Sequence, residues 1–484
     1  MLALFKDLKN MTDTKFSYGM IGLGTMGCNL VLNMSDHGYS VAAYDKNIKQ
    51  TENLYAQAGE RNVKAFNEIK VFVQALKLPR IIMLLVPAGP IVDAVVAELK
   101  PLISAEDIIV DCGNSHFTDT QKRIDQLAKE HIHFVGLGVS GGETGARFGP
   151  SIMPGGDLQA YEKLSPMLTA IAAKINGKPC TAYMGSGAAG HYVKMVHNGI
   201  EYAIMQMIAE AYHLLKIYAG LNNQELQDVF ATWDKGRLQS YLIEITAAVF
   251  LQKDENGYEM LIDKIKDTAK QKGTGAWMSQ DAMATGSPVP SIDAAVSARI
   301  LSSMKNERAV ASEIYPLIIS QTISTEKNDF ISLLEDALYA AFVITYAQGL
   351  AMLQTSSDNY KYNTDLKRVA SIWRGGCIIR AAMLEDILKT YQAEPEINNI
   401  LNGKKFSAVV AVSQKSLRKI VQIGTQQAIP LPSLSASLNY FDSYRSKWLP
   451  ANLIQAQRDF FGAHTYERID KEGTFHTEWN ASIQ

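Results

Sequence analysis

The chain has 484 residues, of which 47% are hydrophobic and 20% are charged, with 34 glycines and 15 prolines. This composition excludes an intrinsically disordered or collagen-like protein, and the length favours two to four domains. The 47 basic and 49 acidic side chains leave a net charge of −2. We therefore expect neither nucleic acid nor an acidic membrane surface as a partner.

The cysteines and the N-terminal residues indicate the cellular compartment of the protein. The four cysteines are far apart in the chain and form no Cys-x-x-Cys pair: Cys28, Cys112, Cys180 and Cys377. We expect reduced thiols, no bound metal and a cytoplasmic location. No uninterrupted apolar run approaches the ~20 residues that span a bilayer. Residues 1–15 lack a signal-peptide pattern and are predicted to be a disordered extension, in which Met11 is an alternative start.

Residues 16–188 predict a doubly wound α/β domain of the Rossmann type. Short apolar runs bounded by Gly, Asp or Pro alternate with longer segments of helical spacing: FSYGMIG, YSVAAYD, RIIMLLV, DIIVDCG and HFVGLGV. Continuous runs of Val, Ile and Leu are typical of strands buried on both faces, and crossover helices separate parallel strands. The dominant expectation is therefore a parallel sheet covered by helices.

The first predicted strand leads into a glycine-rich turn and then into a helix, through Gly22, Leu23, Gly24, Thr25, Met26 and Gly27. In such a turn the first glycine permits the tight bend and the second lets a pyrophosphate approach the backbone. The third lets helix and strand pack closely, and the phosphates face unpaired N–H groups at the helix N-terminus. A purely structural glycine turn is the alternative. The position at the head of an α/β region favours a dinucleotide site.

The second predicted strand ends in Tyr44-Asp45-Lys46-Asn47. A carboxylate at Asp45 would accept hydrogen bonds from a ribose 2′-hydroxyl and repel a 2′-phosphate, which favours NAD. Lys46 has the opposite effect, because an ammonium group can pair with that phosphate. These residues alone leave the choice between NAD and NADP open.

Residues 189–446 predict a large all-helical domain with two similar halves. Two long stretches have the broad apolar stripes of helices buried in a bundle: GHYVKMVHNGIEYAIMQMIAEAYHLLKIYAG and DFISLLEDALYAAFVITYAQGLAMLQT. Each precedes a similar motif, in which Trp233 and Gly236 correspond to Trp373 and Gly376. Duplication explains this repeat, and chance similarity of two amphipathic helices is the alternative. Residues 447–484 are polar, aromatic and turn-rich, and predict a tail that docks on another surface.

One helical segment carries polar side chains on a face otherwise suited to burial: Lys194-Met-Val-His197-Asn198-Gly-Ile-Glu201-Tyr202. At about 100° per residue, Lys194, Asn198 and Glu201 lie within about 60° of one another. Such a stripe is costly unless its members are paired or face a cavity. The spacing alone allows either a catalytic group or a surface Lys–Glu pair.

Five motifs, in order, resemble those of the decarboxylating 6-phosphogluconate dehydrogenase family: GLGTMG, GVSGGETGARFGPSIMPGG, KMVHNGIEY, QKGTGAW and ANLIQAQRDFFGAHTYER. The resemblance runs from about Phe16 to Ile469. It implies oxidation of 6-phosphogluconate at C3 and loss of C1 as CO2, giving ribulose 5-phosphate and a reduced nicotinamide, usually NADPH. Such an enzyme serves the oxidative pentose phosphate route or gluconate breakdown. The wider β-hydroxyacid dehydrogenases share the glycine turn and the lysine, but lack the second helical half and the tail.

The resemblance also implies roles for individual residues. Lys194 is similar to the family's general base and Glu201 to its acid, with Asn198 beside them. The implied substrate contacts are Asn114, Ser140, Gly141, Gly142, His197, Asn198, Tyr202, Lys272, Arg299, Arg458 and His464. The implied cofactor contacts are the six residues of the glycine turn, Asp45, Lys46, Asn47, Val86, Pro87, Ala88 and Asn114. Arg458 and His464 of the tail would enter the active site of a second subunit, which implies an obligate homodimer.

The chain departs from the family pattern around the cofactor. Asp45-Lys46-Asn47 stands where many NADP-using members have Asn-Arg-Thr, and Pro87 stands where a lysine commonly precedes Ala-Gly. Two positive charges are absent or displaced, so we expect NAD to be used at least as well as NADP.

Two other functions compete with this one. A β-hydroxyacid dehydrogenase acting on an unphosphorylated acid would not need the cations Lys272, Arg299 and Arg458. A non-catalytic nucleotide-binding scaffold would not need the polar stripe around Lys194.

Overall fold

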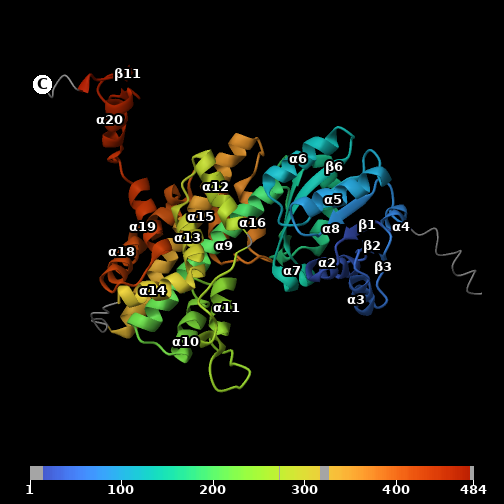
Figure 1. Ribbon diagram of the computed structural model, residues 1–484, viewed down its shortest axis with the longest axis horizontal. Coiled ribbons are helices and arrows are strands. Elements are labelled where there is room, and N and C mark those ends of the chain that lie inside the picture. Colours follow the sequence, from blue (N-terminus) through green and yellow to red (C-terminus); the bar gives the residue numbers. More distant parts are fainter. Residues whose placement is uncertain (1–14, 272, 317–325, 480–484) are drawn as a thin grey trace, which may run out of the picture. The chain divides into compact units, whose positions relative to one another are not determined.

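The computed structural model describes residues 15–271, 273–316 and 326–479, which fall into two units divided between Ser437 and Leu438. Within the first unit, Figure 1 shows a half that contains a sheet, followed by a helical half. This is the predicted order of an α/β domain and a large helical domain. The predicted extension, residues 1–15, lies outside the described residues except for Lys15, and Lys272 also lies outside them.

A seven-stranded sheet organises the N-terminal half of the first unit, in the order β3-β2-β1-β4-β5-β6-β7. The strands are β1 Tyr18–Ile21, β2 Val41–Tyr44, β3 Val63–Phe66, β4 Ile81–Leu84, β5 Ile108–Asp111, β6 His133–Ser140 and β7 Ser151–Gly156. Strands β1 to β6 pair in parallel, whereas β7 is antiparallel to β6. The apolar runs predict five of these strands. They miss β3 and β7, because VKAF is short and half-buried and SIMPGG ends in Pro and Gly.

Helices cover both faces of this sheet. They are α2 Thr25–Asp36, α3 Ile48–Ala58, α4 Ile69–Gln74, α5 Pro90–Leu99, α6 Phe117–Ala128, α7 Gly142–Phe148 and α8 Leu158–Ile171. The neighbouring residues Met20 and Ile21 of β1 are both buried, but in different apolar clusters. Because successive side chains of a strand point to opposite faces, the sheet is buried on both sides.

The C-terminal half of the first unit is helical. Its helices are α9 Ala189–His213, α10 Asn223–Trp233, α11 Tyr241–Val249, α12 Thr274–Thr285, α13 Pro290–Ser303, α14 Lys305–Ile314, α15 Lys327–Tyr360, α16 Leu366–Trp373, α17 Met383–Ala393 and α18 Lys404–Gln426. Helix α19, Pro432–Tyr444, contains the division between the two units. In the described part of the chain, only α15 is long and apolar enough to cross a membrane, and 72% of its most apolar window is buried inside the structure.

The two Trp-containing motifs occupy equivalent places in the helical half. Trp233 ends α10 and Trp373 ends α16, and both side chains are buried. The loops that follow pair with each other through two backbone hydrogen bonds: Tyr241 N–H donates to Arg380 O at 3.0 Å, and Ala382 N–H donates to Gln239 O at 2.9 Å. These reciprocal bonds fit two similar halves; their origin by duplication stays a prediction.

The second unit contains α20 Ala451–Gly462 and a short hairpin of β10 Tyr466–Glu467 and β11 Thr474–Phe475. It begins at Leu438, and the described part of the predicted tail, residues 447–479, falls within it. One fully buried carboxylate, Asp459, organises this unit. It accepts hydrogen bonds from the backbone N–H groups of Thr465 and Thr477, the Trp479 indole and the His476 ring, at 2.8–3.1 Å.

Candidate active site

The predicted cofactor and substrate residues gather at one edge of the sheet. The glycine turn follows β1, Asp45 follows β2, Val86 follows β4, Asn114 follows β5 and Ser140 ends β6. These strands are parallel, so their carboxyl ends lie at the same edge. The strand order reverses between β1 and β4, which is where open α/β sheets bind ligands.

The glycine turn has the geometry that phosphate binding requires. Gly22 has φ +95°, and a Cβ on it would collide with the backbone of Leu85. A Cβ on Gly27 would collide with the carbonyl of Gly22, whereas a Cβ on Gly24 would meet nothing within 4 Å. Helix α2 then starts at Thr25 and Met26 without a side-chain cap or an acidic residue in its first turn. The open space faces free backbone N–H groups, which fits a pyrophosphate.

Asp45 makes two internal contacts. Its carboxylate accepts hydrogen bonds from the backbone N–H groups of Leu23 and Asn47, each at 2.8 Å. It thus ties the end of β2 to the glycine turn. Each carboxylate oxygen has a second lone pair, so a ribose hydroxyl can still donate to Asp45. Asn47 also caps helix α3, because its side chain accepts from Lys49 N–H.

A cavity of about 550 Å³ lies beside the glycine turn. It is lined by Ile21, Gly22, Gly24, Tyr44, Asp45, Lys46, Ile69, Leu85, Val86, Pro87, Pro90, Ile91, Ala94, Val95 and Glu98. The apolar lining from the loop after β4 and from α5 suits a flat heterocycle such as adenine. Six of the predicted cofactor residues are part of this lining, and the other seven are not: Leu23, Thr25, Met26, Gly27, Asn47, Ala88 and Asn114.

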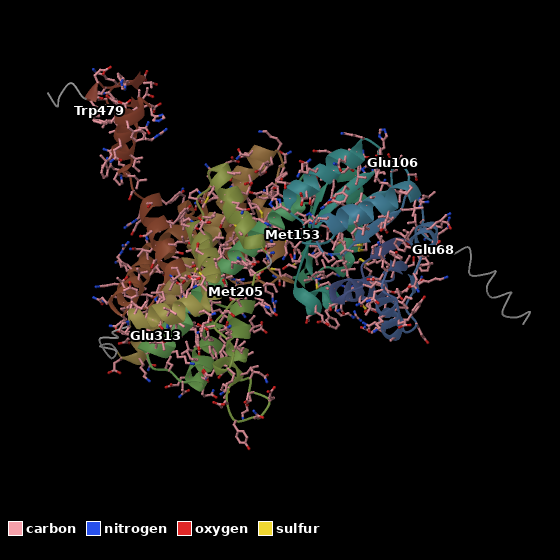
Figure 2. All side chains as sticks on the ribbon, in the orientation of Figure 1. Glu68, Glu106, Met153, Met205, Glu313 and Trp479 are labelled. Carbon is pink, nitrogen blue, oxygen red and sulfur yellow. The ribbon has the colours of Figure 1, made fainter. Side chains whose placement is uncertain are left out.

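Helix α9 carries the catalytic candidates and packs directly against β6 and β7. A Cβ on Gly138 of β6 would lie only 2.5 Å from Cβ of Lys194. A Cβ on Gly190 would collide with the carbonyl oxygens of Gly136 and Met153, and Met153 is labelled in Figure 2 in the region between the sheet and the helices. Glycines therefore permit this close approach, and they fix the position of Lys194 relative to the sheet.

Lys194 and Glu201 are the two ionisable members of the predicted stripe. The Lys194 side chain is 7% exposed, and burial lowers its pKa although the Glu201 carboxylate opposes this. Burial raises the pKa of Glu201, while Lys194 and Arg299 oppose that shift. The directions of these two pKa shifts favour a neutral amine on Lys194 and a protonated carboxyl group on Glu201. These are the forms that a general base and a general acid need.

His197 joins the strand-end loop to the catalytic helix. Its ring is fully buried, and burial holds its pKa well below the usual range, so the imidazole is neutral. Nδ1 donates to Asn198 Oδ1 at 3.0 Å, which leaves Nε2 to accept from the Ser140 hydroxyl at 3.2 Å. The loop continues through Gly141 and Gly142, both with positive φ. Five of the predicted substrate residues are thus in one place: Ser140, Gly141, Gly142, His197 and Asn198.

Tyr202 and Arg299 form a second predicted pair. The guanidinium carbon of Arg299 lies 3.6 Å from the centroid of the Tyr202 ring, and its Nη2 lies 3.4 Å from Sδ of Met205. A Cβ on Gly275 would lie 2.5 Å from the same ring. The start of α12, which belongs to the QKGTGAW motif, therefore packs on Tyr202.

A buried polar network beneath the site is not predicted by the motifs. His191 donates from Nε2 to the Asp111 carbonyl at 3.0 Å, and its Nδ1 lies 2.7 Å from Thr120 Oγ1. The Asp111 carboxylate accepts from the Ser115 hydroxyl at 2.6 Å and lies 3.6 Å from Arg123 Nη1. Nη2 of Arg123 donates to the carbonyl of Gly89, in the loop between β4 and α5, at 3.0 Å. The one sequence signal is that His191 lies three residues before Lys194, on the same helix face.

The predicted tail residues lie in the second unit. Arg458 is exposed on α20 and donates to Gln455 at 3.0 Å. His464 is exposed, and its ring lies edge-on to Phe461, with centroids 5.9 Å apart. Their contact with a substrate stays a prediction. Among the residues described, no cluster of three or more His, Cys, Asp or Glu side chains could hold a metal ion, and the four cysteines are free and buried.

A doubly wound sheet, an open glycine turn and a buried lysine on the helix that packs against β6 define a Rossmann-fold dehydrogenase. Residues 17–195 match the family "NAD binding domain of 6-phosphogluconate dehydrogenase", and residues 190–479 match "6-phosphogluconate dehydrogenase, C-terminal domain". The chain belongs to the 6-phosphogluconate dehydrogenase family, as the sequence motifs predict.

Individual relatives are similar to this chain over almost its whole length. The chain is 49% identical to the NADP(+)-dependent, decarboxylating 6-phosphogluconate dehydrogenase of Bacillus subtilis, over 96% of this chain and 99% of that one. It is 46% identical to the decarboxylating enzyme of Escherichia coli, over 96% and 99%. The solved 6-phosphogluconate dehydrogenase of Plasmodium falciparum superposes with a TM-score of 0.93 at 40% identity, covering 96% of this chain and all of that one. That structure was determined without ligand, with its cofactor NADP+ and with its substrate 6-phosphogluconate.

Proposed function

We propose that the protein catalyses the oxidative decarboxylation of 6-phosphogluconate to ribulose 5-phosphate and CO2, with reduction of NAD(P). The observation that carries the proposal is a buried Lys194 with a lowered pKa, on the helix that packs against the sheet of the dinucleotide domain, in a chain of this family. The relatives from Bacillus subtilis and Escherichia coli are named for this reaction, and the Plasmodium enzyme binds 6-phosphogluconate.

The first step needs a neutral base. A nicotinamide held at the glycine turn would supply the hydride acceptor for C3. That hydride can leave only as the C3 hydroxyl loses its proton, so Lys194 takes the proton on Nζ. Burial supports this role, because it lowers the pKa of the amine.

The second step needs an acid at the same place. The oxidised substrate is a β-keto acid, and its carboxylate leaves as CO2 when the C3 carbonyl accepts the electron pair. Lys194, now an ammonium, donates a hydrogen bond to the developing enolate oxygen. Glu201 then protonates the enediol carbon that was C2 of the substrate and becomes C1 of ribulose 5-phosphate. The raised pKa of Glu201 supports a protonated resting form.

The remaining site residues hold the substrate. Asn114 and the loop of Ser140, Gly141 and Gly142 bind its carboxylate and hydroxyls, with His197 and Asn198 completing the set. Tyr202, Lys272 and Arg299 bind its phosphate, because a planar guanidinium and an ammonium match phosphate oxygens.

The cofactor follows from two opposing arguments. The relatives from Bacillus subtilis and Plasmodium falciparum are named with NADP, which supports NADP binding here. Asp45 supports NAD, because its carboxylate would repel a 2′-phosphate. We propose that NAD is used at least as well as NADP. The ratio of kcat/KM for the two cofactors tests this, and a hundredfold preference for NADP would contradict the role given to Asp45.

We also propose an obligate homodimer, in which Arg458 and His464 complete the site of the partner subunit. The second unit supports this, since several large apolar side chains on and around α20 are exposed: Trp448, Leu449, Leu453, Ile454, Phe460 and Phe461. A surface with so much exposed apolar area usually meets another protein. A cytoplasmic location and the lack of nucleic-acid, membrane and metal partners stay predictions.

One assay separates this function from its rivals. The purified protein is incubated with 6-phosphogluconate and each nicotinamide, and release of CO2 is measured with reduction of the cofactor. A β-hydroxyacid dehydrogenase would reduce the cofactor only with an unphosphorylated acid and would release no CO2 from 6-phosphogluconate. A non-catalytic scaffold would do neither.

A further inference from the structure

The cofactor cavity contains an ion pair that the proposed chemistry does not use. Nζ of Lys46 lies 2.5 Å from Oε1 of Glu98, which is in the last turn of α5. Both residues line the cavity beside Asp45. Their side chains are 65% and 39% exposed, so the pair sits at the rim of the cavity and in contact with solvent.

We propose that Glu98 is a specificity-determining residue that limits the use of NADP by holding the ammonium group of Lys46. This inference rests on the proposed function, because it concerns which nicotinamide that reaction uses. It adds a residue to the cofactor site that lies far from the glycine turn in sequence.

The charges around the cavity support this role. Among the described residues of the lining, Lys46 alone carries a positive charge, and Asp45 and Glu98 carry negative charges. NADP differs from NAD by a phosphate dianion on the adenosine ribose, which needs a cation. With Glu98 in place, that cation is already paired and the dianion faces two carboxylates. The neutral ribose of NAD meets no such cost.

The exposure of the Lys46–Glu98 pair sets the expected size of the effect on cofactor binding. Ion pairs that contact solvent contribute little, so loss of the Glu98 charge changes binding of a charged group by about threefold to about tenfold. The effect should shrink at high salt, because dissolved ions screen exposed charges. If Glu98 had a purely structural role, its loss would change kcat/KM for both cofactors alike, and the change would not depend on salt.

The test is Glu98→Gln, which keeps the shape of the side chain and removes its charge. We expect the kcat/KM ratio of NADP over NAD to rise about fivefold, mainly through a lower KM for NADP. Adding Lys46→Ala to this variant should cancel the gain. Glu130→Gln is the matched control: Glu130 pairs with Lys100 at 2.5 Å with similar exposure, but neither residue lines the cavity. An unchanged ratio, or the same change in the control, would overturn the inference.

A binding measurement separates this inference from the proposed function. The affinities of 2′,5′-ADP and 5′-AMP are measured by calorimetry for the wild type and Glu98→Gln. A gain for 2′,5′-ADP alone supports the role of Glu98 even if no CO2 is released, in which case only the proposed function fails. Equal affinities in the two proteins overturn the role of Glu98 whatever the activity.

Discussion

His191 on the catalytic helix donates a hydrogen bond from Nε2 to the backbone carbonyl of Asp111, at 3.0 Å. This bond fixes the ring's neutral tautomer, so Nδ1 accepts from the Thr120 hydroxyl at 2.7 Å. Burial lowers the pKa of His191, which keeps the ring neutral. The relationship ties α9, three residues before Lys194, to the strand whose following loop carries Asn114.

Thr120→Val should therefore destabilise the protein. Valine has nearly the shape of threonine but leaves Nδ1 of His191 buried without a donor, which costs about 1–3 kcal/mol in the free energy of unfolding. Urea titration followed by circular dichroism measures it. Thr425→Val is the control, because Thr425 is exposed on α18 and bonds only to its own helix. Equal losses in the two variants would contradict the role of this bond.

Lys194→Met should abolish turnover and spare cofactor binding. Methionine keeps the length and the burial of the side chain but has no basic nitrogen, so kcat should fall by at least about a thousandfold. Cofactor binding is followed by fluorescence of the reduced nicotinamide. Lys216→Met is the control, since Lys216 follows the same helix but pairs with Asp263 at 2.5 Å. Substantial activity in Lys194→Met would disprove the base assignment.

The pH profile of kcat/KM should be bell-shaped. Lys194 must be neutral to accept a proton, so the rate falls as the pH drops through its lowered pKa. Glu201 must be protonated to act as the acid, so the rate falls as the pH rises through its raised pKa. Glu201→Gln should lower kcat and remove the alkaline limb while retaining the acid limb. An alkaline limb that persists in this variant would assign it to another group.

Gly138→Ala should disturb the catalytic helix. The added Cβ would lie 2.5 Å from Cβ of Lys194, so α9 has to shift. Overpacking of this kind costs about 1–3 kcal/mol in stability, and a displaced base should lower kcat more than it raises KM. Gly236→Ala is the control, because the nearest atom to its Cβ would be 3.7 Å away. Wild-type kcat in Gly138→Ala would show that the helix position is not critical.

Asp459→Asn should unfold the second unit. Burial alone would raise the pKa of Asp459, but hydrogen bonds from His476, Trp479 and two backbone N–H groups lower it to about 2. The carboxylate therefore stabilises this unit at pH values above about 4, which is the pKa of an aspartate in the unfolded chain. The stabilisation is lost as the pH falls towards 2.

Limited proteolysis and light scattering check this variant. We expect faster cleavage after residue 447, loss of the dimer and loss of activity, with cofactor binding retained. Asp470→Asn is the control, since Asp470 forms an exposed pair with Arg468. A stable and active Asp459→Asn dimer would contradict the structural role of the carboxylate.

The sequence predicts those parts of the fold and site that local patterns encode. Buried strands such as RIIMLLV are continuous apolar runs, and the glycine turn has a fixed spacing, so both are visible without a structure. The family motifs identify Ser140, His197 and Lys194, which the structure brings to one edge of the sheet. Strand β7 escapes prediction because its Pro and Gly residues are tolerated only at a sheet edge.

Long-range contacts could not be predicted. Arg123 and Asp111 are separated along the chain and meet only after α6 packs on the sheet. The same holds for Glu98, whose partner Lys46 is 52 residues away. The sequence suggests a ribose contact for Asp45, but not its bonds to Leu23 and Asn47, because these depend on the path of the backbone.

The glycines between the catalytic helix and the sheet have a mechanical consequence. Where Gly190 meets the carbonyls of Gly136 and Met153, backbone touches backbone, and no flexible side chain lies between them to absorb a sliding movement. The sheet and the N-terminal part of α9 therefore behave as one rigid block. The position of Lys194 relative to the sheet is thus set by backbone packing and not by the conformations of intervening side chains.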